Sequence, residues 1–166
     1  MPAPARRKLR FESIDDALAE VDRLATAERD GRLTKVGNWS LGQALNHMAT
    51  WAEFAFDGYP SNVRPPWVLR TLLTTFRGLI LNRGMTTGVK IPGIEGGTLG
   101  IEPIPTEQAL PRFRAAMDRL RTETPPNANP LFGRLTREQW VKLNLRHAEL
   151  HLGFQVPTTS ADSPGR

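Results

Sequence analysis

The 166-residue chain contains no cysteine. It therefore forms no disulfide, offers no thiolate to a metal and has no cysteine nucleophile, so any thiol chemistry would need a thiol supplied from outside. Long apolar runs are also missing, because Arg70 and Arg77 interrupt the most apolar stretch, residues 67 to 81, which is too short to span a bilayer. The basic N-terminal residues are followed by neither an apolar segment nor a cleavage pattern. We therefore expect a soluble, cytoplasmic protein without a membrane partner.

Acidic residues are outnumbered, which gives a net charge of +5 and a pI near 10.4. The arginines are nevertheless scattered over the chain, and one dense cluster occurs near the N-terminus, at Arg6, Arg7, Lys8 and Arg10. This cluster lacks the interleaved aromatic residues of many nucleic-acid-binding surfaces. We interpret it as a solvated arm and expect no specific nucleic-acid partner.

The length and the 39% hydrophobic content suit one compact domain. We expect a disordered basic arm at residues 1–10, a helical domain at residues 11–156 and a disordered tail at residues 157–166, where proline, serine and threonine are frequent. The chain has no internal repeat.

Apolar residues recur at steps of three and four in several segments, which is the pattern of amphipathic helices. Ser13 is a candidate N-cap, Ser40 and Thr136 each open a capping box, and Pro111 should make the helix that contains it start late or bend. The expected helices lie at residues 13–31, 40–58, 65–84 and 107–121, and from residue 136 onward.

Residues 84–105 contain nine glycines and prolines, so no core helix fits there. A connection of this length in a small domain indicates either a crossover strap or a lid over a site. The predicted fold is therefore all-α: an antiparallel helical bundle with an extra helix and a long connection rich in glycine and proline.

The chain has only three histidines: His47, His147 and His151. His147 and His151 are four residues apart, so they share one face of a helix and continue its apolar stripe. His47 lies between Ala44 and Trp51 on another predicted helix. Three imidazoles suit zinc, nickel, copper or iron and leave coordination positions open. The alternative is that all three are core histidines satisfied by hydrogen bonds.

Two runs that contain these histidines carry a resemblance to a known family. The sequences WSLGQALNH, from Trp39 to His47, and RHAELHLGF, from Arg146 to Phe154, resemble the DinB/YfiT-like superfamily of helical metalloproteins. Residues 129–140, NPLFGRLTREQW, resemble a branch known only as domain of unknown function 1569. The resemblance extends from about residue 11 to residue 154.

This resemblance implies a four-helix bundle, to which the helix within residues 60–105 is an addition, and the metal ligands His47, His147 and His151. Relatives include thiol-dependent transferases and isomerases and metal-dependent hydrolases. Many relatives follow the last histidine with a basic residue, glycine and glutamine, whereas this chain has Leu152, Gly153, Phe154 and Gln155. That departure concerns the reaction type and leaves the ligands unchanged.

The HAELH sequence differs from the HEXXH motif of zinc proteases, in which glutamate directly follows the first histidine. Glu149 lies about 200° around the helix from both histidines, so it should face away from the metal into solvent. No general base can be assigned. Gln43 and Asn144, one turn before His47 and His147, are candidates to support the ligands.

We therefore expect a metal-dependent enzyme with a three-histidine site for zinc or nickel, with iron as a further candidate. It would be a thiol-dependent transferase or a hydrolase, and its small-molecule substrate would enter a pocket walled by Trp51, Phe54 and Trp140. A low-molecular-weight thiol is a candidate partner, and the sequence does not decide whether the protein forms a homodimer. The alternatives are a non-catalytic, metal-stabilised helical bundle and, third, a basic nucleic-acid binder.

Overall fold

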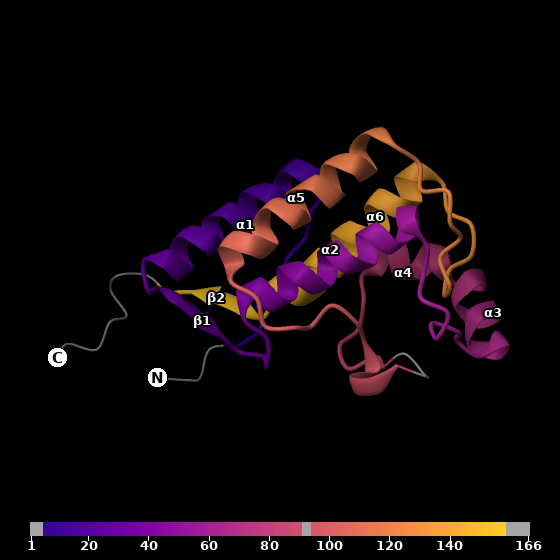
Figure 1. Cartoon of the computed structure of the whole chain (residues 1–166), viewed down its shortest axis with the longest axis horizontal. Coiled ribbons are helices and arrows are strands. Elements are labelled where there is room, and N and C mark those ends of the chain that lie inside the picture. The colour runs from indigo at the N-terminus through magenta and orange to yellow at the C-terminus, as the bar shows by residue number, and fades with distance from the viewer. Residues whose placement is uncertain (1–4, 91–93, 159–166) are drawn as a thin grey trace.

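The computed structural model describes residues 5–90 and 94–158, and most of these residues are helical (Figure 1). The helical class expected from the sequence is confirmed, although a small two-stranded sheet, which was not expected, joins the helices. The elements are α1 (Ile14–Arg29), β1 (Leu33–Lys35), α2 (Leu41–Asp57), α3 (Trp67–Thr75), α4 (Arg77–Arg83), the 3-10 helix η1 (Glu95–Gly97), α5 (Thr106–Thr122), α6 (Arg137–Leu152) and β2 (Gln155–Pro157).

Capping boxes begin three of the four long helices: the sequence predicts the boxes at Ser40 and Thr136, and at Ser13 it predicts only an N-cap. In each box the cap hydroxyl accepts the N–H of the residue three positions later, whose side chain accepts the N–H of the cap residue. These reciprocal bonds fix where α2 and α6, the two helices that carry histidines, begin. The pairs are Ser13 with Asp16, Ser40 with Gln43, and Thr136 with Gln139.

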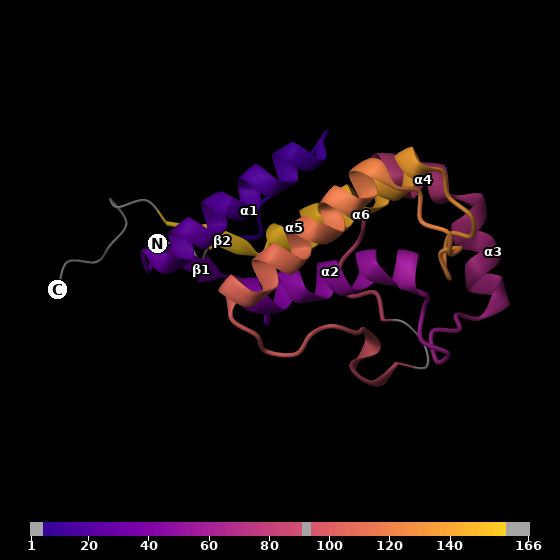
Figure 2. The same ribbon diagram turned by 45° about the horizontal axis from the view of Figure 1, so that its top comes forward.

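The four long helices pack on one another (Figures 1 and 2). Helix α2 contacts both α5 and α6, and α1 contacts the same two helices. This arrangement brings α2 and α6 side by side although 79 residues, 58–136, lie between them in the sequence. The largest fully buried apolar side chains between the helices are Val21, Leu24, Leu41, Leu45, Phe113, Met117, Leu120, Trp140 and Leu152.

Helix α5 begins at Thr106, directly after Pro105, so of the two effects predicted for Pro111, a late start or a bend, the late start does not occur. Pro111 lies inside the helix and lacks the amide that would bond to the carbonyl of Glu107. Both residues are exposed, and water can therefore satisfy the carbonyl that Pro111 leaves free.

The third predicted helix is divided into α3 and α4 at Phe76, so the prediction of one continuous helix is wrong. The hydroxyls of Thr71 and Thr75 bond to carbonyls one turn back, a contact that bends helices, and Gly78 follows the break. No residue of α3 is buried. In the described part of the chain, no helix is long and apolar enough to cross a lipid bilayer.

The sheet joins the connection between α1 and α2 to the segment that follows α6. Strands β1 and β2 pair antiparallel, with Lys35 opposite Gln155. Residues 5–10, the described part of the expected basic arm, lie against the end of α6, where the Arg7 N–H donates to the carbonyl of Gly153 at 2.8 Å. The first four residues of that arm, and the expected tail from residue 159 onward, are outside the described residues.

Candidate metal centre

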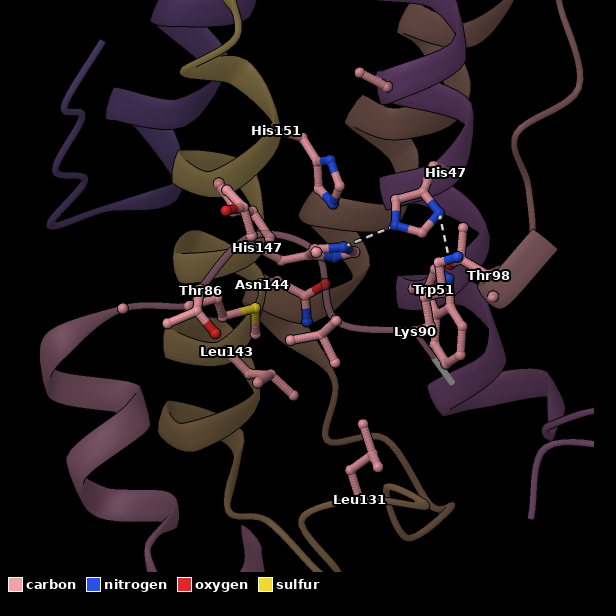
Figure 3. A pocket seen from close by; sticks show the side chains of 18 of the residues that line it. His47, Trp51, Thr86, Lys90, Thr98, Leu131, Leu143, Asn144, His147 and His151 are labelled. Atoms are coloured by element: carbon pink, nitrogen blue, oxygen red, sulfur yellow. Dashed lines mark hydrogen bonds between the residues drawn. The ribbon is translucent and has the colours of Figure 1, made fainter. Parts of the chain in front are cut away.

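All three histidines converge on one point between α2 and α6 (Figure 3). One ligating nitrogen from each of His47, His147 and His151 lies within 4.8 Å of the other two. His47 is contributed by α2, and the other two by successive turns of α6. The structure thus brings together the residues that spacing singled out, and this cluster can hold a metal ion.

The spacing of the rings fits a shared ion. The Nε2 atoms of His47 and His147 are 3.0 Å apart, and the rings of both lie 4.7 Å, centre to centre, from the ring of His151. Two nitrogens bound about 2.1 Å from one ion are separated by about 3.0 Å when they subtend a right angle at it. A hydrogen bond between two neutral imidazoles would have the same length. The ring of His151, the third of the cluster, has no hydrogen-bond partner among the described residues and is half-buried.

The orientation of His47 is fixed by a backbone carbonyl. Its Nδ1 atom lies 2.6 Å from the carbonyl oxygen of Leu99, and the Thr98 hydroxyl is 3.5 Å from the same nitrogen. A carbonyl can only accept, so Nδ1 carries the proton and Nε2 presents its lone pair to the other histidines. A carbonyl bonded to the second nitrogen is a usual partner of a metal-binding histidine.

Residues 94–105, which we call the strap, hold that carbonyl in place along α2 (Figure 2). Three successive strap carbonyls accept hydrogen bonds from side chains of α2: Leu99 from His47, Gly100 from Asn46 and Ile101 from Gln43. The backbones approach closely, since a Cβ atom on Gly100 would lie 2.6 Å from the Thr50 hydroxyl oxygen. Of the two forms predicted for the long connection, a crossover strap and a lid, residues 94–105 therefore adopt the first along α2.

Burial keeps the three imidazoles neutral. It is the largest cause that lowers the pKa of His47 from 6.5 to about 4, against an opposing effect of the Leu99 carbonyl. Burial also lowers the pKa of His147 well below 6.5, followed by the charges of His151 and His47. The pKa of His151 falls for the same first reason, with smaller effects of His47 and Arg6. Neutral imidazole is the form that binds metals.

The histidines face a cavity of about 640 Å³. Its walls are mainly apolar, and no aspartate or glutamate is among its described lining residues. Trp51 and Trp140 line the cavity as predicted, but Phe54 does not and packs instead against Trp51 and Tyr59. Phe54 was therefore wrongly placed in the wall. The first part of the long connection, residues 84–90, also lines the cavity.

Trp39 is the wall residue that the sequence did not indicate. Its ring stacks on His151 at 5.0 Å with 15° between the planes. The side-chain amide of Gln155 donates to the Trp39 carbonyl at 3.1 Å, and Gln155 is held by the β1–β2 pairing. The only local signal was the position of Trp39 directly before the cap residue Ser40.

Neither residue proposed to support the ligands is bonded to a histidine ring among the described residues. Gln43 donates to the strap carbonyl of Ile101, so it acts on His47 through the strap. Asn144 donates to the Trp140 carbonyl in its own helix and lines the cavity beside the histidines.

Glu149 points away from the histidines, as helical geometry predicted, but the prediction that solvent surrounds it is wrong. Its carboxylate is 8% exposed, accepts the Phe11 N–H at 2.7 Å and lies 3.1 Å from the Arg146 guanidinium. The segment that precedes α1 covers this side of α6, which a helical stripe alone cannot reveal.

Fold and site define a mostly helical protein with a cluster of three histidines, one buried and two half-buried, beside an apolar cavity. The sequence matches the family model described as protein of unknown function (DUF1569) over residues 3–158. The chain belongs to this family, and the branch indicated by residues 129–140 is confirmed. No curated protein and no solved structure matches the chain.

Proposed function

We propose that the protein is a metal-dependent enzyme in which His47, His147 and His151 hold one divalent transition metal ion beside the substrate cavity. The observation that carries the proposal is the convergence of three imidazoles, one buried and two half-buried, whose lowered pKa values keep them neutral and one of which is oriented by the Leu99 carbonyl. Purely nitrogen ligation suits zinc or nickel, with iron as a further candidate.

The donor set leaves room for a ligand from outside. Three protein ligands are typical of catalytic sites, whereas structural zinc sites are closed by four. The chain has no cysteine, and no carboxylate lines the described cavity, so no residue of these types can complete the coordination shell. A divalent ion bound there would supply a positive charge that stabilises a thiolate or polarises a carbonyl oxygen.

The lack of a carboxylate also favours one reaction over another. A bound metal ion lowers the pKa of water to about 7, but hydrolysis still needs a residue that transfers the proton to the leaving group, whereas a thiol, which ionises near 8.5 when free, needs only to lose its proton at the ion. A thiol therefore depends much less on a protein base. We infer a thiol-dependent transferase, with hydrolase as the second reaction type, and a low-molecular-weight thiol as one of two substrates.

The apolar walls define what the second substrate must offer. Trp39, Trp51 and Trp140 provide flat surfaces, and the indole N–H of Trp51 is a buried donor without a partner among the described residues. A small apolar molecule that carries one hydrogen-bond acceptor would satisfy both features.

We also propose that the protein is related to the DinB/YfiT-like superfamily. The packing of α1, α2, α5 and α6, with histidines on α2 and α6, supports a DinB/YfiT-like bundle in which α3 and α4 are the addition. The thiol-dependent transferases of that superfamily make the inferred reaction consistent with the fold.

A non-catalytic, metal-stabilised helical bundle is the alternative, because an ion bound to α2 and α6 would also tie together distant parts of the chain. An exogenous ligand separates the two functions. We expect the cobalt-substituted protein to develop a sulfur-to-metal charge-transfer band that saturates with added mercaptoethanol, and to conjugate that thiol to chlorodinitrobenzene only when metal is present. The His151→Gln variant should show neither effect.

An unchanged cobalt spectrum would mean a closed, structural site and would overturn the enzyme proposal. A saturating band with conjugation that is equally fast in the metal-free protein would overturn the metal's role in the reaction.

A further inference from the structure

The exposed apolar side chains of the protein are gathered in one segment. All six of the large hydrophobic residues that are strongly exposed in the described chain lie between residues 67 and 89. Trp67 is 77% exposed, and the set is Trp67, Val68, Leu72, Phe76, Leu79 and Val89. Single exposed apolar residues are ordinary, but six within one short segment mark an interaction surface.

The same segment carries the whole net charge of the protein. Residues 58–90 contain five of the 22 basic residues and none of the 17 acidic ones, so the remainder is balanced at 17 of each sign. The loop that contacts this segment, residues 124–136, adds one more cation, Arg134, and no acid. The five cations are Arg64, Arg70, Arg77, Arg83 and Lys90.

The segment lies at one end of the molecule. Helix α3 is at the end opposite to the β1–β2 sheet in both views (Figures 1 and 2). Val68, Leu72 and Phe76 follow at steps of four along α3, so they share one face of that helix. This face has no partner among the described residues, because no residue of α3 is buried.

We propose that residues 58–90, which we call the basic apolar segment, bind the surface of an anionic lipid bilayer. Tryptophan, phenylalanine and leucine enter the boundary between headgroups and acyl chains, and arginines bind the anionic headgroups. A polyanion without an apolar layer, such as a nucleic acid, would leave Val68, Leu72 and Leu79 unused. This mode needs no spanning helix, and it replaces the expectation from sequence that no membrane takes part.

A second copy of the chain fits this surface poorly. The commonest dimers are two-fold symmetric and place the same patch of both chains face to face. Such a dimer would set five cations against five cations with no acidic residue between them. An anionic bilayer instead supplies charges of the opposite sign.

The cavity connects membrane binding through this surface to the proposed enzymatic function. Leu73 and Ile80 of the basic apolar segment line the cavity, while the residues directly before them, Leu72 and Leu79, are exposed. Val89 both lines the cavity and is exposed. One short stretch of chain thus forms both a cavity wall and the exposed patch. A protein bound through it would present that wall of the cavity to the membrane, where apolar substrates accumulate.

Vesicle binding of the full chain tests the proposal. We expect the protein to sediment with phosphatidylcholine vesicles that contain phosphatidylglycerol and not with phosphatidylcholine alone, and added salt should weaken binding. Arg70→Gln with Arg83→Gln, and separately Trp67→Ser with Leu72→Ser, should each reduce partitioning about tenfold or more. These side chains are largely exposed, so the variants should fold normally.

The matched control is Arg29→Gln with Lys35→Gln, which removes the same charge at exposed positions outside the segment and should leave binding unchanged. Equal loss in the control would mean a nonspecific charge effect and would overturn the proposal. Absence of binding to anionic vesicles at low salt would also overturn it. So would a dimer that Trp67→Ser dissociates, because a second copy would then be the occupant.

Discussion

The Nδ1 atom of His47 lies 2.6 Å from the carbonyl oxygen of Leu99. This contact joins the helix that carries one candidate ligand to the strap that crosses it. It sets the tautomer of His47, and it makes the metal site dependent on a segment that contributes no ligand of its own.

The close approach at Gly100 should therefore control metal affinity. Its φ of +74° suits glycine, and a Cβ would lie 2.6 Å from the Thr50 hydroxyl oxygen. Gly100→Ala should move the Leu99 carbonyl and weaken metal binding about 10-fold to 100-fold, measured by competition with a chelator. Gly88→Ala is the matched control, since Gly88 has a φ of +79° but no atom near the added methyl group. Equal affinities of the Gly100→Ala variant and the native protein would contradict the role of the strap.

The stability of the metal-free protein should fall as the pH falls from about 6.5 to about 4. Burial lowers the pKa of His47 from 6.5 to about 4, so the unfolded chain binds a proton in this window that the folded chain does not. The contribution of His47 to the free energy of unfolding is therefore fully present above its unfolded pKa of 6.5. About 3 kcal/mol of it is lost as the pH falls through the folded pKa of about 4. Urea unfolding across the window measures the loss.

His47→Gln keeps a donor for the Leu99 carbonyl but does not titrate, so its stability should depend less on pH than that of the native protein. An identical pH dependence in the two proteins would show that His47 is not the group responsible.

Glu149 should matter for folding and not for the metal. Arg146 is 1% exposed, donates to the Phe11 carbonyl and is paired with Glu149. Glu149→Gln leaves that buried cation without its counter-ion and should cost about 3 kcal/mol of unfolding free energy. Glu138→Gln, on the exposed first turn of the same helix, should change stability much less. Loss of metal, or of activity by about a hundredfold with unchanged stability, would instead reveal a catalytic base.

Local signals explain what the sequence could predict. The capping boxes at Ser40 and Thr136 and the spacing of His147 and His151 depend only on neighbours within one or two helical turns. The same holds for the direction of Glu149 relative to the histidines. Such signals are complete within a short window, and they correctly placed the three histidines and the starts of the helices that carry them.

The remaining features depend on contacts between distant segments. The Leu99 carbonyl is a backbone group, which any residue type would provide, and Trp39 reaches His151 only because β1 pairs with β2. Glu149 is buried by the segment before α1, and α3 packs on the core through the partly buried Leu73 without burying any of its described residues. None of these contacts leaves a periodic pattern in the sequence.

The most direct test of the central claim is the metal content of the untagged protein and of three single variants, His47→Gln, His147→Gln and His151→Gln, measured by elemental analysis after dialysis. The account predicts one transition metal ion per chain in the native protein and a sharp loss in each variant, with helical content unchanged by circular dichroism. Full metal occupancy in any of the three variants, or a native protein that binds no transition metal when it is supplied, would contradict it.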